Sequence, residues 1–483
     1  MRATRAAGSP FRLGDDELQR LQRNLRAAVR RARRTGAPVL GGISLELPAD
    51  TPPAEVVFAS RRTGERWFVF EQPDRGSAAL AGTGAAVVLE DTGPGRFRRV
   101  AERWRELCAE AVVDSPAAPA GAGLVAFGGF AFAPDGAHAP HWRGFPPASL
   151  TVPELALARG ADGHGSRVVL SVTALACPDD VPEELASRLA ARVEALRLRP
   201  LALLDPDPAG EHVVASAMAP EHYEHAVARA VALEEEGRFE KIVLAREVLV
   251  HAPAPYDPAA LFGVLRAEFP SCFSFCVGRG DATLVAASPE LLLRREGHRV
   301  STLALAGSTR RSADPAVDAH LGEQMLRDPS YREEHAIVAR RIERTLRSHA
   351  IWVAAAPEPQ LVRIANIQHL ATPIRAQLAS PLDTLALAGA MHPTPAVGGE
   401  PLAEAAPLIP ALEGLDRGWY AGPVGWTDAN GDGELCVALR CALLRGAEAR
   451  CYAGNGIVRD SDPARELAET EIKLQALLPL LAG

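Results

Sequence analysis

The stretch GELCVALRCALLRGAEARCYAGNGIV, residues 433–458, carries the pattern that decides the fold class. Its apolar and small residues follow one another without a helical period, and turn residues interrupt them, which is typical of β-strands. We predict a hairpin over 419–445 and a further strand over 450–458. A terminal helix should begin at 463, because Asp462-Pro463 matches an N-cap followed by a proline in the first turn.

The rest of the chain predicts further strands and helices on both sides of a long connector. Clusters of strands with helices between them predict an α+β fold. Residues 1–210 carry few chemical motifs, whereas polar residues recur inside apolar segments from about 218 onward, where the chemistry is expected. The expected elements are a strand and turn at 125–134, helices at 181–197 and 221–237, a strand at 241–250, short strands to 306, a helix starting near 331, and strands and loops to 400.

Composition limits the class of protein. The 483 residues have a formal net charge of -8, which does not favour nucleic-acid binding. No apolar run is long enough to span a membrane. The basic amphipathic segment 16–35 predicts a surface helix, with membrane-surface attachment as the alternative. The seven cysteines lack the spacing of a zinc site, which favours reduced thiols in a cytoplasmic protein.

Two residues are candidates for proton transfer. Lys241 opens the apolar run KIVLAREVLV, where apolar surroundings could leave its amine uncharged and able to act as a general base. The alternative is a strand-end lysine that reaches water. Glu290 precedes three leucines, and a glutamate among apolar groups tends to keep its proton, as a general acid must. Its alternative is a solvated turn carboxylate.

Three further glutamates predict a site for a hard cation. Ser330 and Glu333 match a capping box, which places Glu334 on the apolar face of the following helix. Glu466 and Glu469 recur with Lys473 on one face of the terminal helix. Magnesium prefers one or two carboxylates together with substrate oxygens and water. The alternatives are a buried salt bridge from Glu334 to an arginine and a surface salt-bridge row on the terminal helix.

The strands at 433–458 are expected to contact a ligand. In GELCVALRCALL, Cys436, Ala438 and Arg440 should share one face, and small neighbours leave room for Arg440 to bind a carboxylate. Gly454 and Gly456 leave bare backbone on one face of their strand, which is typical of a close ligand approach or a bulge. DANGDGEL begins like a calcium loop but lacks the final glutamate, so a hairpin turn explains it better.

Together these segments resemble the chorismate-binding enzyme family. They occur in the family's order over about residues 218–478. The resemblance implies the fold of anthranilate synthase component I, with large antiparallel sheets wrapped by helices. It also implies that residues 1–210 form a variable N-terminal half of the same compact fold, beside the catalytic region at 218–478. The matching stretches are KIVLARE, ASPELLLRREG, TLALAGSTRR, REEHAIVARRI, NIQHLATPI, MHPTPAVGGEP, YAGPVGWTDANGDGELCVALRCA and YAGNGIVRDSDPARELAETEIKL.

The resemblance also implies an activity and a role for each candidate residue. KIVLARE and HPTPAVGG are similar to the isochorismate synthase versions of these motifs. Lys241 would activate a water that attacks C2 of chorismate, and Glu290 would protonate the leaving C4 hydroxyl. Magnesium would be held by Glu334 and Glu469, with Glu466 as a further or water-mediated ligand. The expected substrate-binding residues are Gly307, Ser308, His369, Ala396, Tyr420, Arg440, Gly454, Gly456 and Lys473.

Several alternatives remain open within this resemblance. A salicylate synthase would add pyruvate elimination in the same pocket, and an anthranilate or aminodeoxychorismate synthase component I would use ammonia. A non-catalytic chorismate-binding protein is the fourth possibility. The product would serve menaquinone or siderophore biosynthesis, with the N-terminal half and FGGFAF more similar to the menaquinone type. We expect chorismate as the partner, no nucleic acid or membrane, and a monomer or weak dimer.

Overall fold

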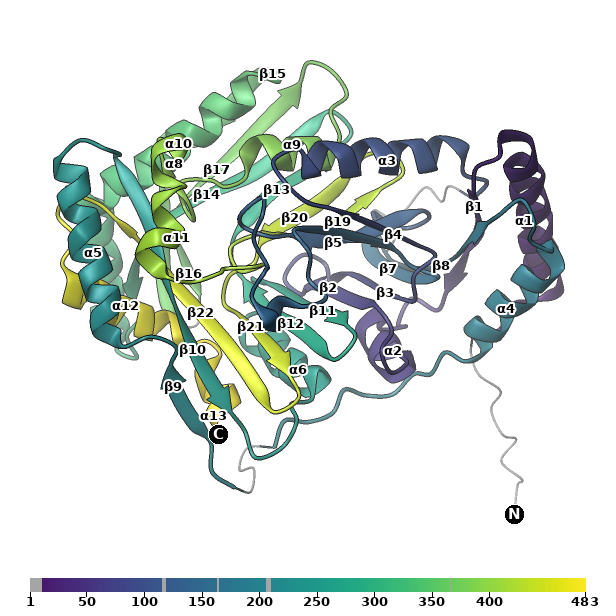
Figure 1. The fold of residues 1–483 in the computed structure, drawn as a ribbon, viewed down its shortest axis with the longest axis horizontal. Helices are drawn as coiled ribbons and strands as arrows, with labels where there is room; N and C mark the ends of the chain where they lie inside the picture. The colour runs from purple at the N-terminus through teal and green to yellow at the C-terminus, as the bar shows by residue number, and fades with distance from the viewer. Residues whose placement is uncertain (1–10, 115–118, 163–164, 206–209, 365) are drawn as a thin grey trace.

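Two large antiparallel sheets form the centre of the molecule (Figure 1). The computed structural model describes residues 11–114, 119–162, 165–205, 210–364 and 366–483. Within these ranges the first sheet is 12-stranded, in the order β1-β8-β7-β3-β2-β11-β12-β21-β22-β10-β18, with β9 paired to β10. Its strands are β1 Val39–Leu47, β2 Trp67–Gln72, β3 Ala78–Thr83, β7 Leu155–Asp162, β8 Gly165–Ala176, β9 Val213–Ser216, β10 Lys241–His251, β11 Phe273–Arg279, β12 Ala282–Ser288, β18 Gly399–Glu400, β21 Cys441–Arg445 and β22 Glu448–Ile457.

The second sheet is 10-stranded over the same described ranges, in the order β15-β17-β14-β13-β20-β19-β5-β6-β4, with β16 paired to β17. Strands from both sides of residue 210 enter both sheets, so the two halves share one core. The division into 1–210 and 218–478 stays a prediction. The strands are β4 Val87–Asp91, β5 Val125–Phe130, β6 Ala148–Val152, β13 Leu291–Glu296, β14 Arg299–Arg310, β15 Ala350–Ala355, β16 Gln360–Ile364, β17 Ile367–Leu378, β19 Pro423–Asp428 and β20 Gly433–Val437.

Aromatic side chains join the two sheets face to face. Phe68 on β2 of the first sheet stacks on Phe127 on β5 of the second, with ring centroids 4.6 Å apart. Both residues belong to a buried cluster that includes side chains from each sheet. Burial of such large apolar groups is the main force that holds packed layers together. The sheets therefore behave as the two halves of one core.

Helices cover the outer faces and the ends of this core (Figure 1). In Figure 1, α8 lies beside β14 and β17, while α5 and α12 lie beside β10 and β22. No helix of the described residues combines the length and the hydropathy needed to cross a membrane. The helices are α1 Asp15–Thr35, α2 Pro53–Ser60, α3 Arg96–Glu110, α4 Pro182–Glu194, α5 Pro220–Glu235, α6 Pro258–Glu268, α7 Pro315–Arg327, α8 Pro329–Arg347, α9 Thr384–Met391, α10 Leu402–Ala405, α11 Leu408–Glu413, α12 Pro463–Leu474 and α13 Leu478–Ala482, with a 3-10 turn at Pro140–Trp142.

The basic helix expected at 16–35 is α1. Its apolar residues, including Leu21 and Leu25, are buried, and it packs on β1 and α4. Arg26 on its polar face pairs with Glu183 at the start of α4, at 2.8 Å. The apolar face of α1 is therefore part of the core of the protein, as a surface helix of a globular domain requires.

The hairpin expected at 419–445 is wrong in its second half. Strands β19 and β20 do form a hairpin, closed by a turn at 428–433, but β20 ends at Val437. The chain then leaves the second sheet and enters the first as β21. Cys436, Ala438 and Arg440 therefore do not share one strand face. Arg440 instead lies in the crossover with a φ of 47°, a conformation that a non-glycine residue rarely adopts.

The helix expected near 331 is α8, which begins at Pro329, but the capping box expected from Ser330 and Glu333 is wrong. Asp328, not Ser330, is the N-cap, and its carboxylate accepts a hydrogen bond from the backbone N–H of Ser330. Glu333 points outward and pairs with Arg340. Several helices were not expected, among them α3, α6, α7 and α9. In α9 every residue after Thr384 is apolar or glycine, so the sequence lacks the polar face on which a periodicity argument depends.

Candidate active site

A cavity of about 570 Å³ opens between the ends of the two sheets. Strands β10 and β22 of the first sheet form one wall, β14 and β17 of the second form another, and α8 and α12 complete it. The lining residues expected from the sequence come from all six elements. A pocket of this size with a few convergent charged groups is typical of a small-molecule site.

Lys241 and Glu290 both lie at the buried end of this cavity. Lys241, the first residue of β10, is 1% exposed, and its ammonium contacts the Oε1 atom of Glu334 at 2.9 Å. Glu290 follows β12 and is 4% exposed. Burial raises the pKa of Glu290 to about 8, although the charges of Lys241 and Arg440 oppose this rise. The Glu290 carboxyl therefore keeps its proton at neutral pH.

The ion pair changes one detail of the expectation for Lys241. The sequence suggested apolar surroundings, but the nearest charged group is a carboxylate. Glu334 does form the buried ion pair that was considered for it, with a lysine in place of an arginine. Gly456 on β22 makes room for this pair, because a Cβ atom there would lie 2.4 Å from both Glu334 Oε1 and Lys241 Cε.

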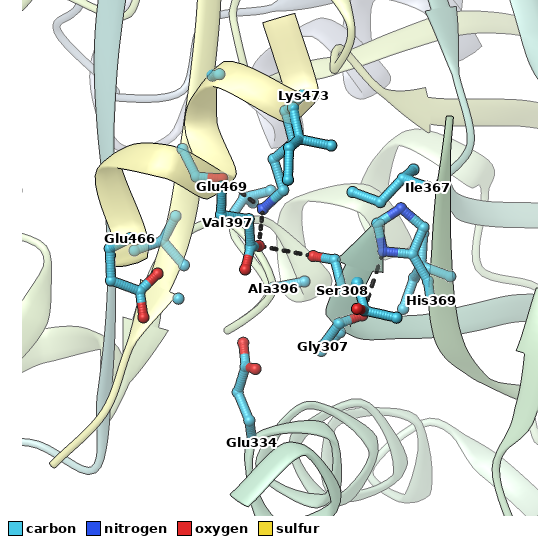
Figure 2. Close-up of a pocket in the computed structure, with 18 of the residues that line it drawn as sticks. Gly307, Ser308, Glu334, Ile367, His369, Ala396, Val397, Glu466, Glu469 and Lys473 are labelled. Carbon is cyan, nitrogen blue, oxygen red and sulfur yellow. Dashed lines mark hydrogen bonds and ion pairs between the residues drawn. The ribbon is translucent and has the colours of Figure 1, made fainter. Parts of the chain in front are cut away.

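The three carboxylates of Glu334, Glu466 and Glu469 surround the open part of the cavity (Figure 2). In Figure 2, the carboxylate of Glu334 points across the space toward that of Glu469. Glu469 pairs with Lys473 at 2.8 Å and accepts a hydrogen bond from the Ser308 hydroxyl at 2.8 Å. Burial and the charges of Glu469 and Glu334 raise the pKa of Glu466 to about 7.

As these side chains stand, they do not yet form a metal cluster. Among the described residues, no group of three or more His, Cys, Asp or Glu side chains is arranged to hold a metal ion. Each carboxylate instead has a partner within the protein, since Asn455 donates to Glu466 at 2.9 Å and the two lysines hold the others. The three carboxylates have the chemistry of a hard-cation site but would have to turn toward one ion.

The opposite wall is cationic and has a fixed hydrogen-bond pattern. Burial, Arg440 and Lys473 hold the pKa of His369 well below its usual range, so this imidazole is neutral. Its Nδ1 lies 3.2 Å from the Gly307 carbonyl and its Nε2 lies 3.3 Å from Arg440 Nη2. If Nδ1–H donates to the carbonyl, Nε2 accepts from the guanidinium, and one tautomer satisfies both contacts. His369 thereby fixes the Arg440 fork beside the cavity.

Small backbone elements shape the remaining surface. Gly307 lies at a bulge of β14 with a φ of 73°, which favours glycine, and it brings its peptide next to the cavity. The ammonium of Lys473 donates to the Gly454 carbonyl at 2.9 Å and to Asn455 Oδ1 at 2.6 Å. Two neighbouring donors, Lys473 and Arg440, thus face the same space from different elements.

Residues 27–482 match the family model described as chorismate binding enzyme. The chain belongs to the chorismate-binding enzyme family. It is 37% identical to the salicylate biosynthesis isochorismate synthase of Pseudomonas aeruginosa over 469 residues, 96% of this chain and 95% of that protein. The menaquinone-specific isochorismate synthase MenF of Escherichia coli superposes with a TM-score of 0.75 at 26% identity, over 95% of this chain and all of that one.

The fold predicted for this chorismate-binding enzyme is confirmed. Anthranilate synthase component I from Streptococcus pneumoniae superposes with a TM-score of 0.59 at 23% identity, over 75% of this chain and 81% of that one, and shares the fold. Every residue predicted for the site lines the one cavity: Lys241, Glu290, Gly307, Ser308, Glu334, His369, Ala396, Tyr420, Arg440, Gly454, Gly456, Glu466, Glu469 and Lys473. Their individual roles stay predictions.

The sequence did not reveal a buried pair that supports the cavity of this chorismate-binding enzyme. Arg417 and Glu413 are fully buried and form a bidentate ion pair. Arg417 also donates to the backbone carbonyls of Val397 at 2.7 Å and Val243 at 2.8 Å, which joins the loop at 396–397 to β10. Glu413 is only four residues from Arg417, but α11 ends at Glu413, so no helical pattern links the two residues. The two carbonyl acceptors are distant in sequence and could not have been indicated by a local pattern.

Proposed function

We propose that this chorismate-binding enzyme is an isochorismate synthase. The observation that carries the proposal is the presence of Lys241 and Glu290 in one buried pocket, with the Glu290 carboxyl held in its protonated form. A reaction that adds water at one ring carbon and expels hydroxide from another needs a base and an acid together. The two relatives above carry this activity in their names.

The proposed reaction balances with these two groups alone. Lys241, released from its ion pair and acting as the free amine, accepts a proton from water as the water oxygen bonds to C2 of chorismate. The ring double bonds shift, the C4–O bond breaks, and Glu290 gives its proton to the leaving hydroxyl, which departs as water. One water enters and one leaves, so the product is an isomer of the substrate. In the reverse direction the two residues exchange roles.

Substrate binding must satisfy two carboxylates. The guanidinium of Arg440, fixed by His369, suits bidentate contact with the enolpyruvyl carboxylate, and Lys473 lies beside it. The ring carboxylate would then face Gly307 and Ser308 on the side of the three glutamates. Tyr420, Gly454, Gly456 and Ala396 would provide the apolar and backbone surface around the ring.

Magnesium is the proposed cofactor, since its preferred ligands match the residues present. Glu334, Glu466 and Glu469 bring three carboxylates to one cavity. Burial, together with repulsion from Glu469 and Glu334, raises the pKa of Glu466, and a bound cation would relieve this penalty on the charged form. When bound, the ion would neutralise and orient the ring carboxylate. Glu334 and Glu469 would hold it directly, and Glu466 would bind directly or through water.

Product analysis tests the proposal. The purified protein, chorismate and Mg²⁺ should yield isochorismate by chromatography and mass spectrometry, without pyruvate and without ammonia. Lys241→Ala should abolish turnover while chorismate binding persists, because the lysine is assigned to water and not to a carboxylate. Arg459→Ala, which removes an exposed ion pair with Glu234 outside the cavity, is the control and should retain full activity.

The same experiment distinguishes the other activities considered. Release of pyruvate with salicylate would identify a salicylate synthase, and a strict need for ammonia or glutamine would identify a component I activity. Chorismate binding without any turnover would identify a non-catalytic binding protein. If Lys241→Ala kept its turnover and lost only affinity, the assignment of Lys241 as the base would be wrong.

A further inference from the structure

Lysine is confined to the cavity in this chain. The sequence has 52 lysine and arginine residues, and only positions 241 and 473 are lysine. Every other basic position uses arginine, including the buried Arg417 and the cavity residue Arg440. A chain that tolerates arginine so widely has kept a compact, single-point ammonium at two places. Arginine is a poor replacement for lysine at a position where the side chain must release its partner, because the guanidinium forms two bonds at once in a rigid geometry.

Each of these lysines contacts one of the two carboxylates proposed to hold the metal directly. Lys241 Nζ lies 2.9 Å from Glu334 Oε1, and Lys473 Nζ lies 2.8 Å from Glu469 Oε1. Both ammonium groups are well shielded, with side-chain exposures of 1% and 10%. Each of the two carboxylates is thus neutralised by one monovalent cation of the protein itself.

We infer that the two lysines are exchangeable counter-ions of the metal site, and that both leave their carboxylates when Mg²⁺ binds. This inference rests on the proposed function, in which Glu334 and Glu469 are the metal ligands. A single ammonium contact can be given up one bond at a time, whereas an arginine fork would have to break two. Lys473 can keep its bonds to Gly454 and Asn455 as it leaves.

The charges of the groups involved support the exchange. Without ligands, two ammonium groups balance two carboxylates. With the ion bound, Mg²⁺ balances the same two carboxylates, and the two negative charges that chorismate brings equal the two positive charges that the ion brings. The cavity therefore gains no net charge from these groups when metal and substrate bind together. Either ligand alone leaves an uncompensated charge, so each should favour binding of the other.

Selective labelling can observe the exchange directly, because only two lysine side chains exist. Protein grown on lysine labelled with ¹³C at Cε should give two side-chain signals by NMR, which Lys473→Met assigns. On titration with MgCl₂ in the absence of chorismate, both signals should shift with a common midpoint, and NaCl at equal ionic strength should not move them. Saturable Mg²⁺ binding by calorimetry with both lysine signals unmoved would overturn the inference.

Affinity measurements separate direct contact from general charge. Lys241→Met and Lys473→Met should each bind Mg²⁺ about 10- to 100-fold more tightly than the wild type without substrate, since no ammonium must be displaced. Arg440→Met is the matched control: it removes a positive charge from the same cavity without freeing a ligand, and should change the affinity less than about threefold.

The outcomes are distinct from those of the activity test. An equal gain in Arg440→Met, or no gain in either lysine variant, would overturn the exchange even if the enzyme makes isochorismate. Conversely, lysine signals that shift on Mg²⁺ binding in a protein that forms no isochorismate would support the exchange and refute the proposed function. Neither readout depends on turnover.

Discussion

Replacing Gly456 by alanine should disable the site while the protein stays folded. A Cβ atom at this position would lie 2.4 Å from Glu334 Oε1, 2.4 Å from Lys241 Cε and 2.9 Å from Lys241 Nζ, whereas ordinary contact begins at 3.4 Å. Both side chains must therefore move by about 1 Å, a displacement that can cost roughly 100-fold in rate when it misplaces a catalytic group. The backbone of Gly456 is not in the left-handed region, so alanine adds no backbone strain.

To test this prediction, kcat and KM for chorismate and the melting temperature Tm are measured for the wild type and for Gly456→Ala. We expect kcat to fall about 100-fold and Tm to change little, because the crowded atoms are the ends of flexible side chains. Gly263→Ala in α6 is the control, since its Cβ would meet only Leu201 at an ordinary 3.5 Å. An unchanged kcat in Gly456→Ala, with the fold intact, would refute the assigned geometry of Lys241 and Glu334.

The remaining predictions concern three charged groups. Turnover should fall as pH rises through about 8, where Glu290 loses its proton, and Glu290→Gln should be inactive. Burial raises the pKa of Glu290 from 4.5 to about 8, so the unfolded chain loses this proton at a lower pH than the folded protein does. The folded state of the wild type is therefore destabilised as pH rises from about 4.5 to 8. By calorimetry, Glu290→Gln should melt at a higher temperature than the wild type at pH 8 and at a similar temperature near pH 4.5. Glu469→Gln should raise the Mg²⁺ concentration needed for half-maximal activity, and an unchanged titration would remove it from the metal site. Arg440→Lys should raise KM about 10- to 100-fold at constant Tm, since a single ammonium cannot form the bidentate contact; an unchanged KM would place the enolpyruvyl carboxylate elsewhere.

The sequence predicted the elements whose signals are local. The terminal helix begins at Pro463 with Asp462 as its cap, as expected, because capping and proline placement are properties of adjacent residues. Glu466, Glu469 and Lys473 line the cavity together since spacings of three and four place residues on one helix face. Lys241 was expected at the start of a strand and is there.

Features that depend on distant partners were not predictable in this way. Nothing in GELCVALRCALL indicates that the chain changes sheets between Val437 and Cys441, since both parts have the same strand pattern. That crossover, and not a shared strand face, brings Arg440 to the cavity. The ion pair between Lys241 and Glu334 joins two residues that are remote in sequence, so each looked like an isolated charge beforehand.

The contacts of Arg417 determine which cavity residues can be substituted without loss of the hydrogen bonds that position the loop. Arg417 donates one hydrogen bond to the carbonyl of Val397 in the loop at 396–397 and another to the carbonyl of Val243 in β10. Neither hydrogen bond involves a side chain of the loop or of the strand. The identities of residues 396 and 397 can therefore change without removing these two hydrogen bonds. Natural variation or laboratory selection at these two positions therefore changes the shape of the cavity around the substrate ring, while the hydrogen bonds to the backbone stay in place.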